Sequence, residues 1–185
     1  MDINQFLIWL VILLSAIFLL ALLSLPGKNY GQRFLMLLVL NFVLHFLNIY
    51  FSEFSQQAIP ISLNPFFASN YGPLLWLYFA QFKEENAIPL PKALPYFLHS
   101  VGFLLWGMIS DLSFKSVVVV TSLILMINFG FLTKTISHYF QKEADYILVE
   151  KKWLLSLLGL FGTLLVVVSL NLFFAVTEVS SFHDK

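Results

Sequence analysis

Six stretches of about 20 mostly apolar residues divide this chain, and they constrain its fold more than any other feature. A helix of that length crosses the hydrocarbon core of a bilayer. Hydrophobic residues make up 59% of the 185 residues and charged residues only 11%, and so short a chain cannot hide that much apolar surface in one water-soluble core. We therefore predict an all-α, polytopic transmembrane bundle, a single domain over residues 1–185, with six helices at about 6–25, 34–51, 64–82, 93–110, 117–136 and 153–176.

The third stretch, 64–82, is interrupted near its middle by Gly72 and Pro73. Proline has no backbone N–H and its ring clashes with the preceding turn, so we expect the third helix to be broken there. Inside a bilayer, the carbonyls freed by such a break are tolerated only where other helices or a water-filled cavity satisfy them. The third helix should therefore lie within the bundle and not against lipid.

Lysine and arginine are distributed unevenly among the connecting loops, and this asymmetry sets the orientation of a membrane protein. Eight of the ten basic residues fall in one set of loops, after the first, third and fifth segments: Lys28, Arg33, Lys83, Lys92, Lys134, Lys142, Lys151 and Lys152. The opposite set of loops and ends holds only Lys115 and Lys185. We therefore expect loops 1–2, 3–4 and 5–6 to face the cytoplasm and both termini to lie outside.

Polar residues form one stripe on the second predicted helix, where Asn41, His45, Asn48 and Ser52 are spaced at i, i+4, i+7 and i+11. Polar side chains in hydrocarbon are costly unless they are paired, so the stripe should face the bundle interior. It forms either a polar cavity for a small ligand, with His45 as a proton-sensitive switch, or interhelical hydrogen bonds that fix the packing. The cavity candidates are Asn41, His45, Asn48, Asn64, Asn70 and Asn128, and further partners for the stripe are Ser69 and Asn171.

Small residues form a second stripe, Ser156, Gly159 and Thr163, on the sixth predicted helix. Small residues let helix backbones approach closely. We favour packing within the chain for this stripe, with a homodimer interface as the alternative.

The 5–6 loop has apolar residues at helical spacing with charged residues between them. This pattern predicts an amphipathic extension of the fifth helix on the inner membrane surface, and a solvated linker is the alternative. The apolar positions are Ile136, Phe140, Ala144 and Ile147.

Catalytic and cofactor signatures are missing from the sequence. It has no cysteine and a net charge of zero, and neither a hydrolase, a metalloprotease nor a Walker motif occurs. His99 and His138 each lack a second metal ligand at a recognised spacing. We therefore expect no enzymatic activity, no metal, no cofactor and no nucleic-acid binding by this chain, and we expect the lipid bilayer as its main partner.

Several groups of residues form a pattern that extends loosely over most of the chain. They are Asn64-Pro65-Phe66-Phe67, Tyr71-Gly72-Pro73-Leu74-Leu75-Trp76-Leu77-Tyr78, Lys83 and Lys92, Leu94-Pro95-Tyr96-Phe97-Leu98-His99, and Tyr139-Phe140 to Trp153-Leu154-Leu155. This pattern resembles the membrane module of bacterial AraC-type transcriptional regulators that carry an N-terminal multi-helix membrane domain. In that family a Gly-Pro-Leu-Leu-x-x-Tyr segment precedes a basic loop and a helix that opens with His and Pro.

Two features depart from the family pattern. Pro95 precedes His99, whereas the family more often has the histidine first. The helix-turn-helix domain is missing, and with six crossings a DNA-binding domain after Lys185 would need a seventh crossing to reach the cytoplasm.

The resemblance implies a sensor module in the bacterial inner membrane that takes part in signal transduction and transcription regulation. A structural or accessory subunit of an inner-membrane complex is the alternative, with another membrane protein as its partner. A small transporter ranks last. A broken helix is typical of transporters, but there is neither a second break in a matching position nor an intramembrane carboxylate.

Overall fold

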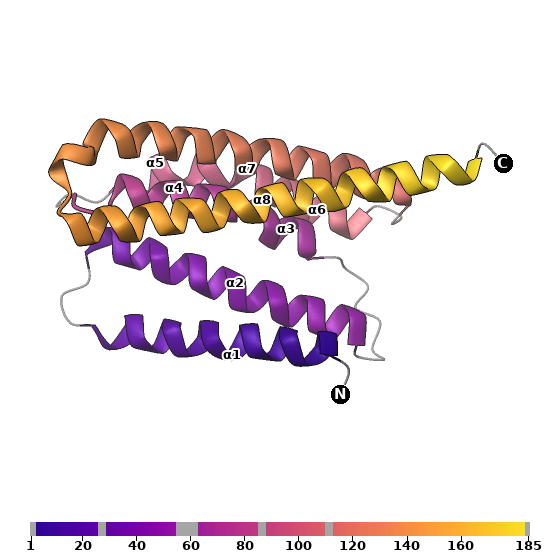
Figure 1. Cartoon of the computed structure of the whole chain (residues 1–185), viewed down its shortest axis with the longest axis horizontal. Coiled ribbons are helices and arrows are strands. Elements are labelled where there is room, and N and C mark those ends of the chain that lie inside the picture. Colours follow the sequence, from indigo (N-terminus) through magenta and orange to yellow (C-terminus); the bar gives the residue numbers. More distant parts are fainter. Residues whose placement is uncertain (1–2, 26–28, 55–62, 85–87, 110–112, 184–185) are drawn as a thin grey trace. The chain divides into compact units, whose positions relative to one another are not determined.

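The computed structural model describes residues 3–25, 29–54, 63–84, 88–109 and 113–183, and within these ranges every regular element is a helix (Figure 1). The predicted all-α class is therefore confirmed. Contacts between residues group the chain into two compact units, Met1–Ser110 and Asp111–Lys185, which we call unit 1 and unit 2. The single domain that we expected over the whole chain stays a prediction.

Unit 1 contains the first four predicted segments. The helices of unit 1 are α1 (Ile3–Ser24), α2 (Tyr30–Phe54), α3 (Asn64–Ser69), α4 (Tyr71–Ala80), α5 (Leu90–Ala93), the 3-10 turn η1 (Leu94–Phe97) and α6 (Leu98–Ile109). Helix α1 packs along α2, α2 packs against both α3 and α4, and α3 packs against α6 (Figure 1).

The third segment is broken, as predicted. The helix is interrupted at Asn70, just before the Gly72–Pro73 pair. Asn70 has φ −81° and ψ −16°, and its N–H bonds to the Phe67 carbonyl in a tightened turn. Pro73 lies in the first turn of α4 and has no N–H to give to Ser69, four residues earlier. The helical hydrogen bonding is therefore interrupted one turn before the proline itself.

Helices α3 and α4 together run antiparallel to α2 along most of its length. At one end, Nδ2 of Asn48 donates to Oδ1 of Asn64 at 2.6 Å. At the other end, Nδ2 of Asn29 donates to the Phe82 carbonyl at 3.2 Å. The broken segment therefore covers α2 from its start to about Asn48, although neither half is long enough to do so alone.

Gly31 lets the start of α2 approach the end of α4. A Cβ atom built on Gly31 would lie 2.8 Å from both the Gln81 oxygen and the Phe82 Cα atom. Real Cβ contacts are not that short, so only glycine fits here without a backbone shift.

The fourth segment becomes regular later than expected. Three prolines (Pro89, Pro91 and Pro95) each remove a backbone donor, and the chain forms one short α-helical turn and one 3-10 turn before α6 begins at Leu98. The predicted start at residue 93 is therefore too early for the regular helix, and the predicted end at residue 110 lies outside the described residues.

Unit 2 is a hairpin of two long helices, α7 (Phe114–Lys142) and α8 (Leu148–His183), joined through the 3-10 turn η2 (Glu143–Asp145) (Figure 1). The side chain of Ser113 caps α7 by accepting the Ser116 N–H. Both helices are longer than predicted because our ranges followed apolar residues alone. Lysine, glutamine and glutamate are also good helix formers, so a helix can continue past its apolar residues.

The fifth helix does extend to Lys142, as the pattern in the 5–6 loop indicated. All four apolar residues of that pattern are exposed: Ile136, Phe140, Ala144 and Ile147. Their position on a membrane surface stays a prediction.

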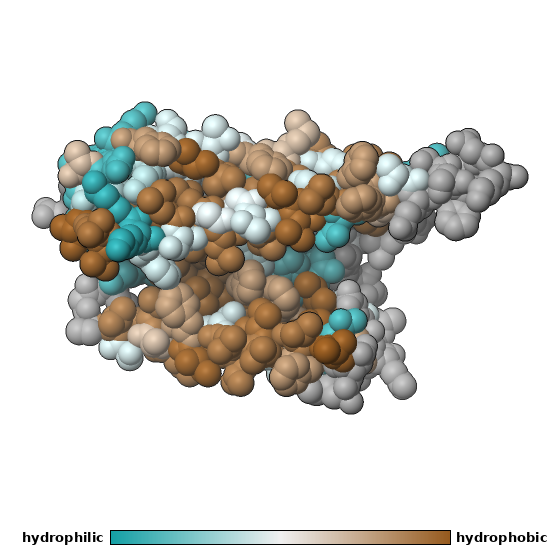
Figure 2. Space-filling view, viewed as in Figure 1, coloured by the Kyte–Doolittle hydropathy of each residue, from teal (hydrophilic) through white to brown (hydrophobic). Residues whose placement is uncertain are grey.

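Among the described residues, four helices are long and apolar enough to cross a membrane: Ile3–Ser24, Tyr30–Ser52, Lys115–Asp145 and Leu148–Thr177. Most of their surface is left uncovered by protein; in α1 only Ile12 and Leu22 are buried. Apolar side chains cover the visible face of α1 and much of α8 (Figure 2). Such surfaces require lipid around them, so the chain is a membrane protein.

Candidate functional site

The polar stripe of α2 meets the broken segment through three hydrogen bonds. Nδ2 of Asn41 donates to the Phe67 carbonyl at 3.0 Å. Nδ1 of His45 and the Tyr71 hydroxyl are hydrogen-bonded at 2.8 Å, and the Asn48 amide bonds to Asn64 as described above. The stripe thus faces the interior of unit 1, which agrees with the expectation. Its last member, Ser52, instead bonds the Ile49 carbonyl of its own helix at 3.0 Å.

The carbonyls at the end of α3 find donors outside the helical ladder. The Ser69 carbonyl, which Pro73 leaves without its usual partner, lies 3.0 Å from Nε2 of His99 on α6. Since a carbonyl oxygen only accepts, Nε2 of His99 must carry the proton and donate it. The Phe66 carbonyl accepts the Ser69 hydroxyl at 2.9 Å. The break is therefore capped by side chains, including one from a neighbouring helix.

A second contact joins α3 to α6 beside this cap. The hydroxyls of Ser69 and Ser100 lie 2.9 Å apart, and the two residues are 0% and 1% exposed. Two small side chains bring the helices close, and their hydrogen bond satisfies both hydroxyls away from water.

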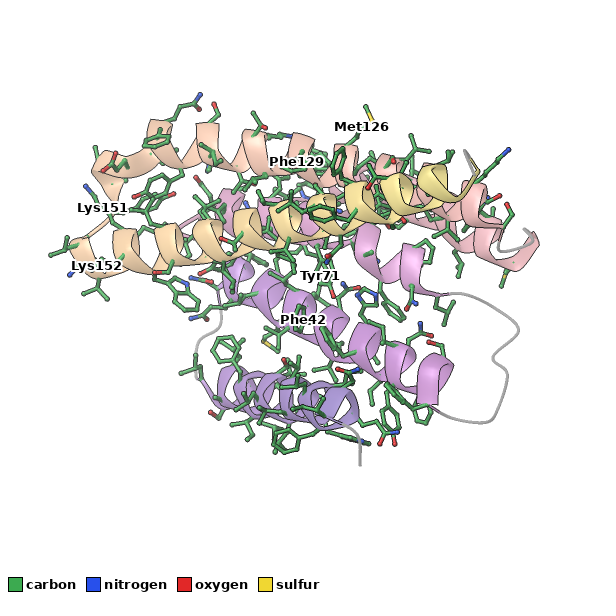
Figure 3. The ribbon with its side chains drawn as sticks, turned by 45° about the vertical axis from the view of Figure 1, so that its right-hand side comes forward. Phe42, Tyr71, Met126, Phe129, Lys151 and Lys152 are labelled. Carbon is green, nitrogen blue, oxygen red and sulfur yellow. The ribbon has the colours of Figure 1, made fainter. Side chains whose placement is uncertain are left out.

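Aromatic rings enclose the hydrogen-bonded pair of His45 and Tyr71. The imidazole stacks on Phe67 with ring centroids 5.9 Å apart and planes at 28°. The Tyr71 ring meets Phe42 edge-on at 5.7 Å, and the two lie next to each other in Figure 3. These contacts hold the imidazole and the phenol in fixed orientations.

The remaining candidates lie in different surroundings. Asn70, Gly72 and Pro73 are all buried at the joint between α3 and α4. Asn128 is buried in unit 2, where its Nδ2 donates to the Ile124 carbonyl of its own helix at 3.0 Å. Asn171 is exposed.

The small-residue stripe of α8 does not face α7. Ser156, Gly159 and Thr163 are exposed, and a Cβ atom on Gly159 would meet nothing within 4 Å. The opposite side of α8 is the packed one, where a Cβ on Gly162 would lie 3.8 Å from Leu132; its buried residues are Leu154, Leu158, Phe161 and Leu165. Within unit 2 the stripe is therefore open to another helix or to lipid.

The polar groups around the break are amides, hydroxyls and imidazoles, with backbone carbonyls as the main acceptors. In the described ranges no group of three His, Asp or Glu side chains is placed to hold a metal ion. Such a set of groups can bind a small polar molecule or join helices.

His99 and Ser100 are the residues that sequence reasoning did not assign to the site. The sequence does predict that some donor is needed here, because a proline at position 73 frees the carbonyl at position 69 and a buried carbonyl needs a donor. The identity of the donor depends on which helix lies beside α3, and spacing along the chain does not reveal that. Tyr71 was noted only for its place in the family-like motif, although it is the partner of His45.

No protein-family model matches the chain, and no curated protein or solved structure matches it either.

Proposed function

We propose that this chain is a membrane-embedded sensor module of a bacterial signalling system, similar to the membrane module of AraC-type regulators. It transmits a signal by rearranging helices and has neither an enzymatic activity nor a nucleic-acid site of its own. The observation that supports this proposal is the row of hydrogen bonds between the polar stripe of α2 and the broken segment. Their atoms and distances are those given above for Asn41, His45 and Asn48.

Weak and exchangeable bonds suit a sensor. A hydrogen bond between transmembrane helices contributes only about 0.6–2 kcal/mol, because the separated helices find other partners. A ligand with a few polar groups can therefore compete for Asn41 or His45. Its binding would shift the balance between two arrangements by the difference in its affinity for them.

We further propose an orientation in the bacterial inner membrane with both termini outside. The excess of Lys and Arg in one set of loops supports it. The loops after α1 and after α4 lie at the same end of unit 1, since Asn29 bonds to the Phe82 carbonyl, and both loops carry basic residues. That agrees with a cytoplasmic position for each.

A transcript comparison tests the proposed role. A strain without the gene would be complemented with the wild-type chain or with His45→Leu, which removes the bond to Tyr71. If the chain is a sensor, the His45→Leu strain should resemble the strain without the gene in its transcripts, while membrane abundance of the protein stays near the wild-type level.

The matched control is Leu44→Ala, a change at the neighbouring residue, whose side chain is 41% exposed. Its transcripts should equal those of the wild type. Wild-type transcripts in the His45→Leu strain, with the protein present, would count against a sensor; disappearance of the protein would indicate that the stripe only supports packing.

A second candidate is an accessory subunit of an inner-membrane complex, and the open small-residue stripe of α8 favours it. If this stripe meets a partner helix, Gly159→Leu should abolish co-purification of a stoichiometric partner from gently solubilised membranes. Gly130→Leu on α7, where a Cβ also meets nothing within 4 Å, is the control. If the Gly159→Leu chain still co-purifies with the partner, the small-residue stripe is not the interface.

A further inference from the structure

We propose that α3 is a hinged half-helix, which pivots at Asn70 between α2 and α6 while α4 stays fixed. The two halves of the broken segment are held in place by different kinds of interaction, and this difference is what the proposal depends on. It describes a movement within unit 1 and does not require the signalling role proposed above.

The fixed half is held by apolar packing. In α4, Leu75, Leu77 and Phe79 are 1%, 0% and 1% exposed. The far end of α4 is locked against the start of α2, where Gly31 leaves no room for even one additional carbon atom. Displacing α4 would disrupt close packing along its whole length.

The pivoting half is held by polar contacts on two sides. On the side of α2, Asn41 and Asn48 bond the Phe67 carbonyl and Asn64. On the side of α6, His99 and Ser100 bond the Ser69 carbonyl and the Ser69 hydroxyl. Every side chain of α3 except Ser69 is only partly buried. Polar partners of this kind can be exchanged for others, whereas close packing cannot.

The joint between the halves is weakened by the sequence. Pro73 has no N–H for the Ser69 carbonyl, so the backbone bond that would hold α3 in line with α4 at this point is missing. His99 replaces it from another helix. Small changes in backbone angles at such a joint are enough to swing a short helix.

Spin labels can measure the movement, because the chain has no cysteine of its own. A reference label at Leu13→Cys, on the exposed face of α1, would be paired either with Phe66→Cys on α3 or with Ala80→Cys at the end of α4. Electron–electron distances would be recorded for the full chain in lipid nanodiscs, with and without the two substitutions Asn41→Leu and His99→Leu.

We expect the 13–66 distance distribution to broaden about twofold or to gain a second population when the polar partners are removed, because the equilibrium between positions of α3 shifts. The 13–80 distribution should stay unchanged. Restoring a donor with His99→Gln should narrow the 13–66 distribution again.

Two results would overturn the proposal. If both distributions broaden, the polar contacts hold the whole unit together and α3 has no movement of its own. If neither changes, α3 is fixed by packing. Neither result decides the sensor role, which the transcript comparison tests separately.

Discussion

A proline and a histidine on different helices act on one carbonyl. Pro73 removes the backbone donor for the Ser69 oxygen, and Nε2 of His99 supplies another at 3.0 Å. In water the carbonyl would bind solvent, but within a bilayer an unsatisfied carbonyl costs several kcal/mol. His99 is therefore a structural donor in this site, and its side chain should be replaceable by another donor of similar reach.

We expect His99→Leu to lower the free energy of unfolding in detergent by about 1 kcal/mol, the usual contribution of such an interhelical bond. His99→Gln should lower the free energy of unfolding clearly less, because the glutamine amide can still donate to the Ser69 carbonyl. Unfolding by titration with a denaturing detergent, followed by circular dichroism, measures both. Equal losses for leucine and glutamine would contradict the role of His99 as a donor.

The two residues should also be energetically coupled. Pro73→Ala restores a backbone N–H that can reach the Ser69 carbonyl, so His99→Leu should cost less in the Pro73→Ala chain than in the wild type. A double-mutant cycle of unfolding free energies measures this coupling, which we expect to be about 0.5–1 kcal/mol. If the two substitutions change the free energy of unfolding additively, His99 does not act through the Ser69 carbonyl.

At the scale of helices, the sequence predicted the number of long segments better than the way they pack. Six apolar stretches and the break could be read from the apolar run lengths and from Pro73. The close approach of α2 to α4 could not, because Gly31 is one of eight glycines and nothing local distinguishes it. The same holds for His99, whose role depends on which helix lies beside it.

Gly31→Ala should destabilise the protein by about 1–3 kcal/mol, the usual cost of forcing an extra carbon into a packed contact. The added Cβ would lie 2.8 Å from backbone atoms of Gln81 and Phe82, so one helix must move. The matched control is Gly102→Ala on α6, where a Cβ meets nothing within 4 Å; alanine should stabilise that helix slightly. Thermal unfolding in detergent compares the two, and equal melting temperatures would exclude a tight contact at Gly31.

At the scale of the whole molecule, the number of crossings decides where the charged loops lie. Four helices reach membrane length on their own. The segment made of α3 and α4 reaches it only as a pair, since it runs beside α2 from Asn48 to Asn29. With six crossings, residue 83 should lie on the cytoplasmic side and residue 115 outside. The opposite orientation would exchange the two sides and put residue 83 outside.

Single-cysteine variants distinguish these arrangements in intact cells. We expect a membrane-impermeant maleimide to label Lys115→Cys from outside and to label Lys83→Cys only after the cells are opened. Both positions are exposed, and the chain has no other cysteine, so the labelling is specific. External labelling of Lys83→Cys would contradict the proposed orientation, because the Asn29–Phe82 bond would then put the loop after α1 outside as well.

The length of α8 has a consequence for the membrane that surrounds it. Between Lys152 and Glu178 the helix carries no charged residue, and this part is about 37 Å long at 1.5 Å per residue. The hydrocarbon of an average bilayer is about 30 Å thick, and a longer apolar helix is accommodated by tilting, by kinking or by local thickening of the bilayer. We expect α8 to tilt. Lipids with longer acyl chains should make it stand more upright, which polarised infrared spectra of oriented bilayers would detect. We therefore expect acyl-chain length to be a variable to which the tilt of α8 responds, to the extent that its packing against α7 allows.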